Sequence, residues 1–276
     1  MKKNMKAVIA IALIAILVLG CFSACGSKKA ASPLDKIKEA GKITLYTEAG
    51  FAPYEFLYNN EVVGVDIEIM KEVAKEIGVE LVIEDVTFDT ICASVKAGKC
   101  DVGAAGITIT EERKQSIAFS DPYTSTAQYV VVLADNNEIA TVEDLAGKDI
   151  GVQQGTTSDI IVENLINDGT LAGSTSSGFT APAVAAASLG KLDAVVTDKL
   201  TAETIVANNA GSFKCFELVK ADGSAAAETE YYGIAVSQEN TELLEVINGV
   251  LKKLKDADQI SAWEQEYQNI AKGLEE

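Results

Sequence analysis

The chain has 276 residues, 48% of them hydrophobic, no histidine, and a formal net charge of −18 at pH 7. The absence of histidine excludes Ser-His-Asp and Cys-His catalysis and removes the commonest zinc ligand. The negative charge argues against a nucleic-acid partner, because it repels phosphate backbones. No Walker-type or GxGxxG glycine loop is present, and we expect neither a metal ion nor another cofactor.

The first residues, 1–24, are predicted to be a secretory signal peptide. A basic start with three lysines precedes an uninterrupted apolar run from Ala7 to Leu19, and small residues follow it, as in signals for export. A permanent transmembrane helix is the alternative, but the apolar run is well short of the ~20 residues that a span needs. Removal of the signal takes three lysines from a total charge of −18 and leaves −21.

The end of this signal resembles the lipid-attachment motif of bacterial lipoproteins. Two small residues, Ser23 and Ala24, directly precede Cys25, and Cys21 is a poorer match. The resemblance implies that Cys25 becomes a lipidated N-terminus, followed by a tether over 25–34. Two acyl chains hold a protein firmly at a membrane where one is marginal, so we expect an extracytoplasmic protein anchored to the cell membrane.

Three cysteines remain beyond the signal, Cys92, Cys100 and Cys215. Their number is odd and their spacing fits no disulfide framework. A chain of about 250 residues can bury a sufficient core without disulfides. We therefore expect three free, buried thiols.

Helix and strand patterns alternate along the rest of the chain. Ser32 to Asp35 form a capping box with proline at the first helical position, which predicts a short helix ending at Gly41. Asp66 is predicted to cap a helix that ends at Gly78. The other predicted elements are strand 42–47, strand 79–84, helix 89–96, strand 101–105, a helix from 110 that is broken at 120–123, strand 129–133, a capped helix from 141 that stops at 147, strand 148–153, helix 158–166, helix 183–189, strand 192–196, strand 232–236 and a helical segment from 240.

This alternation predicts an α/β fold in which parallel sheets are covered by helices on both faces. Two series of elements, 42–123 and 128–228, predict two lobes. Ligands of open α/β sheets bind beyond the carboxyl ends of the strands. Polar residues that follow the predicted strands are therefore candidates for a binding site.

Four segments at strand ends or helix starts carry such residues: 47–54, 105–113, 153–158 and 197–198. A free amino acid would suit them, because its carboxylate needs a guanidinium and helix N-terminal amides. Arg113 and the start of the helix at Ser158 could supply these groups, and Asp198 could bind the ammonium. Taken singly, each has an ordinary alternative: Arg113 as a surface residue, Asp198 as a helix N-cap, and 153–157 as a turn.

Seven pieces in the same order resemble the amino-acid-binding solute receptors of ABC importers, the extracellular family 3. The pieces are FAPYEF at 51–56, GVDI at 64–67, AGKCD at 97–101, AGITIT at 105–110 with ER at 112–113, FSDPY at 119–123, GVQQGTT at 151–157 and DAVVTD at 193–198. The resemblance runs from about residue 42 to residue 263. Cys100 departs from the usual motif and affects packing only.

The resemblance implies a two-lobed periplasmic-binding-protein fold of type II, the Venus-flytrap architecture, with two hinge crossings. Lobe 1 is expected to comprise 35–124 plus 232–276, and lobe 2 to comprise 125–231. The crossings are expected near 124–127 and 229–232. Closure of the lobes would complete the site, since each lobe carries half of it.

The resemblance also implies ten ligand-binding positions. They are Glu48, Phe51, Phe88, Gly106, Thr108, Arg113, Gln153, Thr156, Thr157 and Asp198. Arg113 would bind the ligand carboxylate, helped by the threonines, and Asp198 would bind the ammonium with the carbonyl of Gly106. Phe51 and Phe88 would enclose the ligand side chain.

Glu48 and Gln153 would contact the polar end of that side chain. No lysine matches a pocket position, which favours a neutral polar or a cationic amino acid, and Glu48 favours the latter. The implied function is a monomeric receptor without enzymatic activity that delivers one amino acid to an ABC permease and its ATPase. A dehydratase-type enzyme of the same fold, with Glu48 as acid–base group, and a ligand sensor for a signalling partner are the alternatives.

Overall fold

The computed structural model describes residues 31–273. The predicted signal peptide, Cys25 and most of the predicted tether lie outside these residues. From Pro33 onward the chain forms one compact unit. Within the described range, no helix combines the length and the apolar character that a membrane crossing requires.

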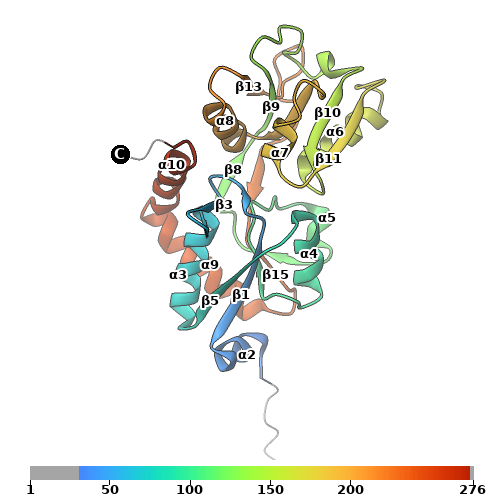
Figure 1. Cartoon of the computed structure of the whole chain (residues 1–276). Helices are drawn as coiled ribbons and strands as arrows, with labels where there is room; N and C mark the ends of the chain where they lie inside the picture. The colour runs from blue at the N-terminus through green and yellow to red at the C-terminus, as the bar shows by residue number, and fades with distance from the viewer. Residues whose placement is uncertain (1–30, 274–276) are drawn as a thin grey trace, which may run out of the picture. The chain divides into compact units, whose positions relative to one another are not determined.

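Two five-stranded sheets, each covered by helices, organise the described chain (Figure 1). The first sheet has the order β5-β1-β6-β15-β7, with β1 (Lys42–Thr47), β5 (Glu80–Asp85), β6 (Val102–Gly103), β7 (Ala118–Phe119) and β15 (Ala235–Val236). The second has the order β11-β10-β12-β9-β13, with β9 (Gln128–Leu133), β10 (Asp149–Gln153), β11 (Thr175–Phe179), β12 (Ala194–Asp198) and β13 (Phe213–Glu217). The prediction of an α/β fold with two lobes is confirmed.

The sheets are mixed, so the prediction of parallel sheets is wrong in part. β1 runs parallel to β5 and β6, and β10 runs parallel to β11 and β12. However, β15 is antiparallel to β6 and β7, and β9 is antiparallel to β12 and β13. The reason is connectivity: β9 and β15 follow the segments that cross between the sheets, and they enter each sheet from the edge at which β1 and β10 end.

The two crossing segments pair with each other. β8 (Thr124–Thr126) and β14 (Glu230–Tyr232) form a two-stranded antiparallel ribbon in which Glu230 lies opposite Thr126. The predicted strand 232–236 is thus divided between β14 and β15. A further sheet of three short strands, β2 (Gly50–Phe51), β3 (Glu55–Tyr58) and β4 (Glu61–Val63), follows β1.

Helices cover both faces of each sheet. They are α2 (Pro33–Ala40), α3 (Val65–Ile77), α4 (Phe88–Lys96), α5 (Glu111–Lys114), α6 (Thr157–Asn167), α7 (Pro182–Ala186), α8 (Lys199–Asn208), α9 (Thr241–Asp256) and α10 (Gln259–Ala271). The apolar residues of the first sheet pack into separate clusters, one with α3 and α9 and one with α4. α10 packs on α3 and α9 and reaches α8, where Asn208 Nδ2 donates to the Ala271 carbonyl at 2.8 Å.

The start of α3 differs from the prediction. Asp66 does not cap this helix, which begins at Val65 after Gly64. Gly64 has φ of +134°, and a Cβ at this position would collide with the carbonyl oxygen of Tyr54. The side chain of Asp66 is fully buried instead, and it accepts a hydrogen bond from the amide of Gly106 at 2.9 Å.

Two other predicted helices are shorter than expected. The helix from Thr110 ends at Lys114, because Ala118–Phe119 pairs with β15 as an edge strand. The segment after Thr141 forms only a 3₁₀ turn, Glu143–Leu145, since Gly147 (φ +75°) leads directly into β10.

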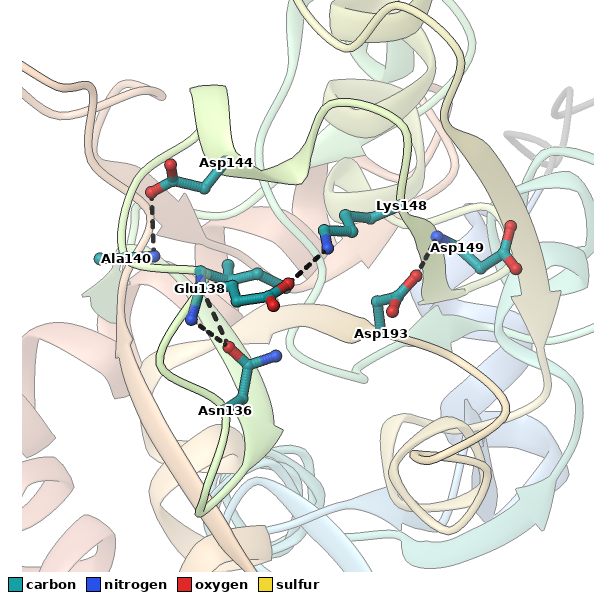
Figure 2. A network of polar contacts seen from close by, with 8 residues as sticks. Asn136, Glu138, Ala140, Asp144, Lys148, Asp149 and Asp193 are labelled. Carbon is teal, nitrogen blue, oxygen red and sulfur yellow. Dashed lines mark hydrogen bonds and ion pairs between the residues drawn. The ribbon is translucent and has the colours of Figure 1, made fainter.

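Side-chain hydrogen bonds and an ion pair surround this 3₁₀ segment, as Figure 2 shows. Asp144 Oδ2 accepts from the amides of Ala140 and Thr141 at 3.1 and 2.9 Å, and Lys148 forms an ion pair with Glu138 at 3.0 Å. Only half of the predicted capping box is present: Asp144 accepts from the amide of Thr141, but the hydroxyl of Thr141 donates to Asp144 and does not cap the segment.

The three cysteines of the described chain are free, as predicted. Only Cys100 is buried, whereas Cys92 and Cys215 are half-buried. The expectation that all three are buried is thus wrong for two of them, which lie at the margins of their apolar clusters.

Candidate functional site

Nine of the ten predicted site residues line one cavity. Its lining is Phe51, Phe88, Ala105, Gly106, Thr108, Arg113, Gln153, Thr156, Thr157 and Asp198. The tenth, Glu48, lies directly behind this lining, where its Oε2 accepts a hydrogen bond from Gln153 Nε2 at 3.0 Å. The cavity has a volume of only about 10 Å³, which is room for about one water molecule.

Arg113 is held in the cavity wall by a short helix. The hydroxyl of Thr110 caps α5 by accepting from the amide of Arg113 at 3.1 Å. The guanidinium donates to the carbonyls of Thr108 at 2.8 Å and Gly155 at 3.1 Å, and it lies 5.5 Å from the centre of the Phe88 ring. Burial lowers the pKa of Arg113.

No carboxylate neutralises Arg113 directly. The ion pairs within 31–273 all use lysine, and Arg113 is the single arginine of the sequence. A half-buried guanidinium held only by neutral carbonyls presents a positive site for an anion.

The second sheet contributes the start of a helix. β10 ends at Gln153, and α6 begins at Thr157 with Thr156 as its cap. The turn between them uses Gly155 with φ of +77°, where a Cβ would lie 2.9 Å from the Cβ of Asp89. The N-terminus of this helix of 11 residues lies at the cavity and favours a negatively charged group there.

Asp198 supplies a buried carboxylate at the end of β12. It occupies the N-cap position of α8 but makes no side-chain cap hydrogen bond, so the ordinary N-cap interaction is not formed. Its Oδ1 accepts a weak hydrogen bond from Gln128 Nε2 at 3.4 Å. Burial, followed by the negative charge of Glu230, raises the pKa of Asp198 to about 7.

A second carboxylate, that of Glu48, comes from the first lobe. Burial raises its pKa to about 7, although the hydrogen bond from Gln153 opposes this shift. Gln153 also donates to the carbonyl of Thr180 at 2.9 Å. Both donor positions of the Gln153 amide are therefore used, and its orientation is set.

Aromatic packing shapes one wall. Phe51 is 6% exposed and stacks on Tyr54 with ring centres 5.8 Å apart. It also packs against Gly106, where φ is +53° and a Cβ would lie 2.6 Å from the Phe51 ring. The amide of Gly106 donates to the buried carboxylate of Asp66. The Phe51 ring and the loop that contains Gly106 therefore fix each other's position.

Two residues that the sequence analysis did not identify join these groups. Glu230 on β14 accepts hydrogen bonds from the hydroxyls of Thr108 and Thr157, and Gln128 on β9 donates to both Glu230 and Asp198. Their only signal in the sequence is a polar residue within or directly after each expected crossing. The site thus offers a cationic end, an anionic end and an aromatic wall.

Comparisons with known proteins agree with this architecture. Residues 43–270 match the bacterial extracellular solute-binding proteins, family 3. A probable histidine-binding protein of Neisseria gonorrhoeae is 31% identical over 262 residues, which cover 92% of each chain.

Two solved structures with bound arginine are also similar. The arginine-bound Gly52Ala mutant of ArgBP from T. maritima has 40% identity and a TM-score of 0.72, and the match covers 80% of this chain and 99% of that one. The amino-acid ABC transporter substrate-binding protein AbpA of Streptococcus pneumoniae, bound to L-arginine, has 28% identity and a TM-score of 0.79, with 88% and 100% coverage. The chain belongs to the bacterial extracellular solute-binding proteins, family 3.

Proposed function

We propose that this protein is the substrate-binding component of an ABC importer and that it binds one basic amino acid, arginine, between its lobes. One cavity carries the proposal. The guanidinium of Arg113, which no carboxylate neutralises directly, and the carboxylate of Asp198 line this cavity, and the carboxylate of Glu48 lies directly behind its lining. Relatives that bind arginine, or are named for histidine, support a basic ligand.

The ligand backbone is assigned to groups from both lobes. Arg113 and the N-terminus of α6 bind the carboxylate, and Asp198 binds the ammonium with the carbonyl of Gly106. A free amino acid carries both charges at a fixed separation, so it satisfies both ends of the cavity at once. A ligand that lacks either charge leaves a buried ionic group unpaired, which is costly.

The ligand side chain is assigned to the aromatic wall and Glu48. Phe51 and Phe88 can enclose the methylene groups and the planar guanidinium of arginine. Glu48 then forms a charge-assisted pair with the guanidinium. An acidic ligand side chain would face Glu48 without a compensating lysine, so aspartate and glutamate are disfavoured.

Entry of the ligand requires the lobes to separate. Five polar contacts hold them together around the cavity, among them Arg113 with Gly155 and Gln153 with Glu48. A volume of about 10 Å³ does not admit an amino acid. We propose that β8 and β14 act as the hinge, and that the ligand stabilises the closed form because only this form brings both halves of the site together.

The receptor is proposed to act at the outer face of the cell membrane as a monomer, held by a lipid on Cys25. It hands the amino acid to a permease driven by an ATPase and does not alter it chemically. Recovery of unchanged arginine after prolonged incubation with the protein separates binding from the dehydratase-type alternative.

A thermal-shift panel of free amino acids tests the proposal. L-Arginine is expected to raise the melting temperature most, followed by other basic amino acids, with no effect of L-glutamate. At 100 times its dissociation constant a ligand adds about 2.7 kcal/mol of stability, which gives a shift of several degrees. Absence of a shift with every amino acid, or the largest shift with L-glutamate, would refute a receptor for basic amino acids.

A further inference from the structure

Glu230 has an unusual place in the molecule. It lies on β14, one of the two strands that connect the lobes, and only 8% of it is exposed. None of the lysine ion pairs within 31–273 involves it. Its carboxylate accepts hydrogen bonds from neutral side chains, and the charge of Arg113 acts on it without a direct ion pair.

One oxygen of Glu230 collects donors from both lobes. Oε2 accepts from the hydroxyl of Thr108 at 2.7 Å and from the hydroxyl of Thr157 at 2.6 Å. Thr108 belongs to the first lobe and Thr157 begins α6 of the second. These short hydrogen bonds join the two halves of the site to the connecting strand.

These donors are the ones assigned to the ligand carboxylate. A threonine hydroxyl has one proton to donate, so it cannot serve Glu230 and the ligand at the same time. In the structure both protons point to Glu230, which therefore stands where the ligand carboxylate would find its hydroxyl donors. The two carboxylates compete for one pair of groups.

We propose that Glu230 is an internal competitor of the ligand carboxylate: it holds the empty site closed through Thr108 and Thr157, and the ligand displaces it. This inference rests on the proposed function, since it assumes an amino-acid ligand in this cavity. Glu230 is therefore a positioning residue: it lowers the affinity of the site for the ligand because it stabilises the form without ligand.

The second oxygen of Glu230 shares a hydrogen-bond donor with Asp198, the residue that is proposed to bind the ligand ammonium. Oε1 accepts from Gln128 Nε2 at 3.0 Å, and the same amide nitrogen lies 3.4 Å from Asp198 Oδ1. The hydroxyl of Ser158 fixes the opposite end of Gln128 by donating to its Oε1 at 2.7 Å. Because both carboxylates meet at one amide group, the negative charge of Glu230 repels that of Asp198 and disfavours the charged form that an ammonium needs.

The test compares Glu230→Ala and the isosteric Glu230→Gln with wild type. Glu228→Ala is the matched control, because it removes the same charge two residues away from an exposed position. Small-angle X-ray scattering of the full chain without amino acid reports closure of the empty lobes. Calorimetric titration with L-arginine reports affinity.

For Glu230→Ala we expect a larger radius of gyration in the empty state and L-arginine binding about ten-fold tighter than in wild type, the effect of one hydrogen bond to a charged group. Glu230→Gln, which retains an acceptor oxygen, should show a smaller gain, and Glu228→Ala should match wild type. Unchanged or weaker binding in both Glu230 variants overturns the proposal.

Failure of the proposed function would look different. If wild type bound no amino acid, scattering of the empty proteins would still decide the role of Glu230. A more open Glu230→Ala would support the closing role, whereas identical curves for wild type and both Glu230 variants would refute it.

Discussion

At the scale of single residues, the proposed site combines ionisable groups that form no ion pair within residues 31–273. Asp198 and Glu48 both have pKa values raised to about 7, chiefly by burial. Burial likewise lowers the pKa of Arg113. A zwitterionic ligand with a cationic side chain would pair with all three groups. Because these groups are poorly solvated without a ligand, pairing them contributes favourably to the free energy of binding.

Proton linkage follows from these carboxylates. Asp198 and Glu48 must be ionised to pair with a bound cation, and below pH 7 each carries a proton that binding removes. The dissociation constant for L-arginine is therefore expected to rise as the pH falls below 7, by up to about ten-fold per pH unit for each group. Above about pH 8 it should become constant.

Calorimetry between pH 5 and 8.5 measures this dependence. In Glu48→Gln only Asp198 still titrates, so the dissociation constant should change with pH by the contribution of one group and not of two. Equal affinities at pH 5 and pH 8 would contradict the assignment.

The same pKa shifts make the folded protein without ligand bind more protons than the unfolded chain between about pH 4 and 7. These two groups therefore lower the stability of the empty form as the pH rises through that window.

The sequence predicted most of the residues that line the cavity, because they occur in compact motifs that resemble the family and that lie at the ends of predicted strands. Arg113 follows a capping threonine, and Thr157 follows Gly155, so their local placement could be inferred. Glu230 and Gln128 could not be found in this way. Glu230 lies on a crossing strand and Gln128 directly after the other one, and their meeting depends on the pairing of β14 with β8, which no local pattern encodes.

At the scale of elements, the short loops before helices fix the site more strongly than the helices do. Gly64 permits α3 to begin directly beneath the carbonyl of Tyr54, and this start places Asp66 against the amide of Gly106. The geometry at Gly64 is therefore linked to the position of the Gly106 carbonyl in the cavity.

Gly64→Ala is expected to destabilise the protein by about 2–4 kcal/mol, because alanine is strained at φ of +134° and its Cβ collides with backbone. Denaturant unfolding measures the effect. Gly249→Ala is the matched control: this glycine lies inside α9, and a Cβ there meets nothing within 4 Å. It should stabilise the protein by about 0.5–1 kcal/mol. A Gly64→Ala protein as stable as wild type would contradict this account of α3.

Helices with caps and apolar periodicity were predicted well, as α2, α6 and α9 illustrate. Short strands were not, because two or three residues carry no usable periodicity. β7 is an example, with two residues inside a segment that was predicted to be helical, whereas β6 falls within the predicted strand 101–105. β11, with the sequence TSSGF, is a partly exposed edge strand that lacks apolar alternation, and it was missed for that reason.

At the scale of the whole molecule, two α/β lobes are joined by paired strands, and the site lies where the strands of both sheets end. The two lobes could be predicted from the repeated series of elements. The mixed sheets could not, because the direction of β9 and β15 depends on how the chain crosses between lobes. The strongly acidic sequence contains a single arginine, and it lies in the cavity.

The most direct test of the account is a calorimetric cycle that pairs Arg113 with the ligand carboxylate. Wild type, Arg113→Ala and the neighbouring control Lys114→Ala are titrated with L-arginine and with its decarboxylated analogue, agmatine. Wild type and the control should bind one L-arginine per chain and agmatine far more weakly. Arg113→Ala should weaken L-arginine binding at least about 100-fold and change agmatine binding little. An Arg113→Ala protein that binds L-arginine within a few-fold of wild type would contradict the account.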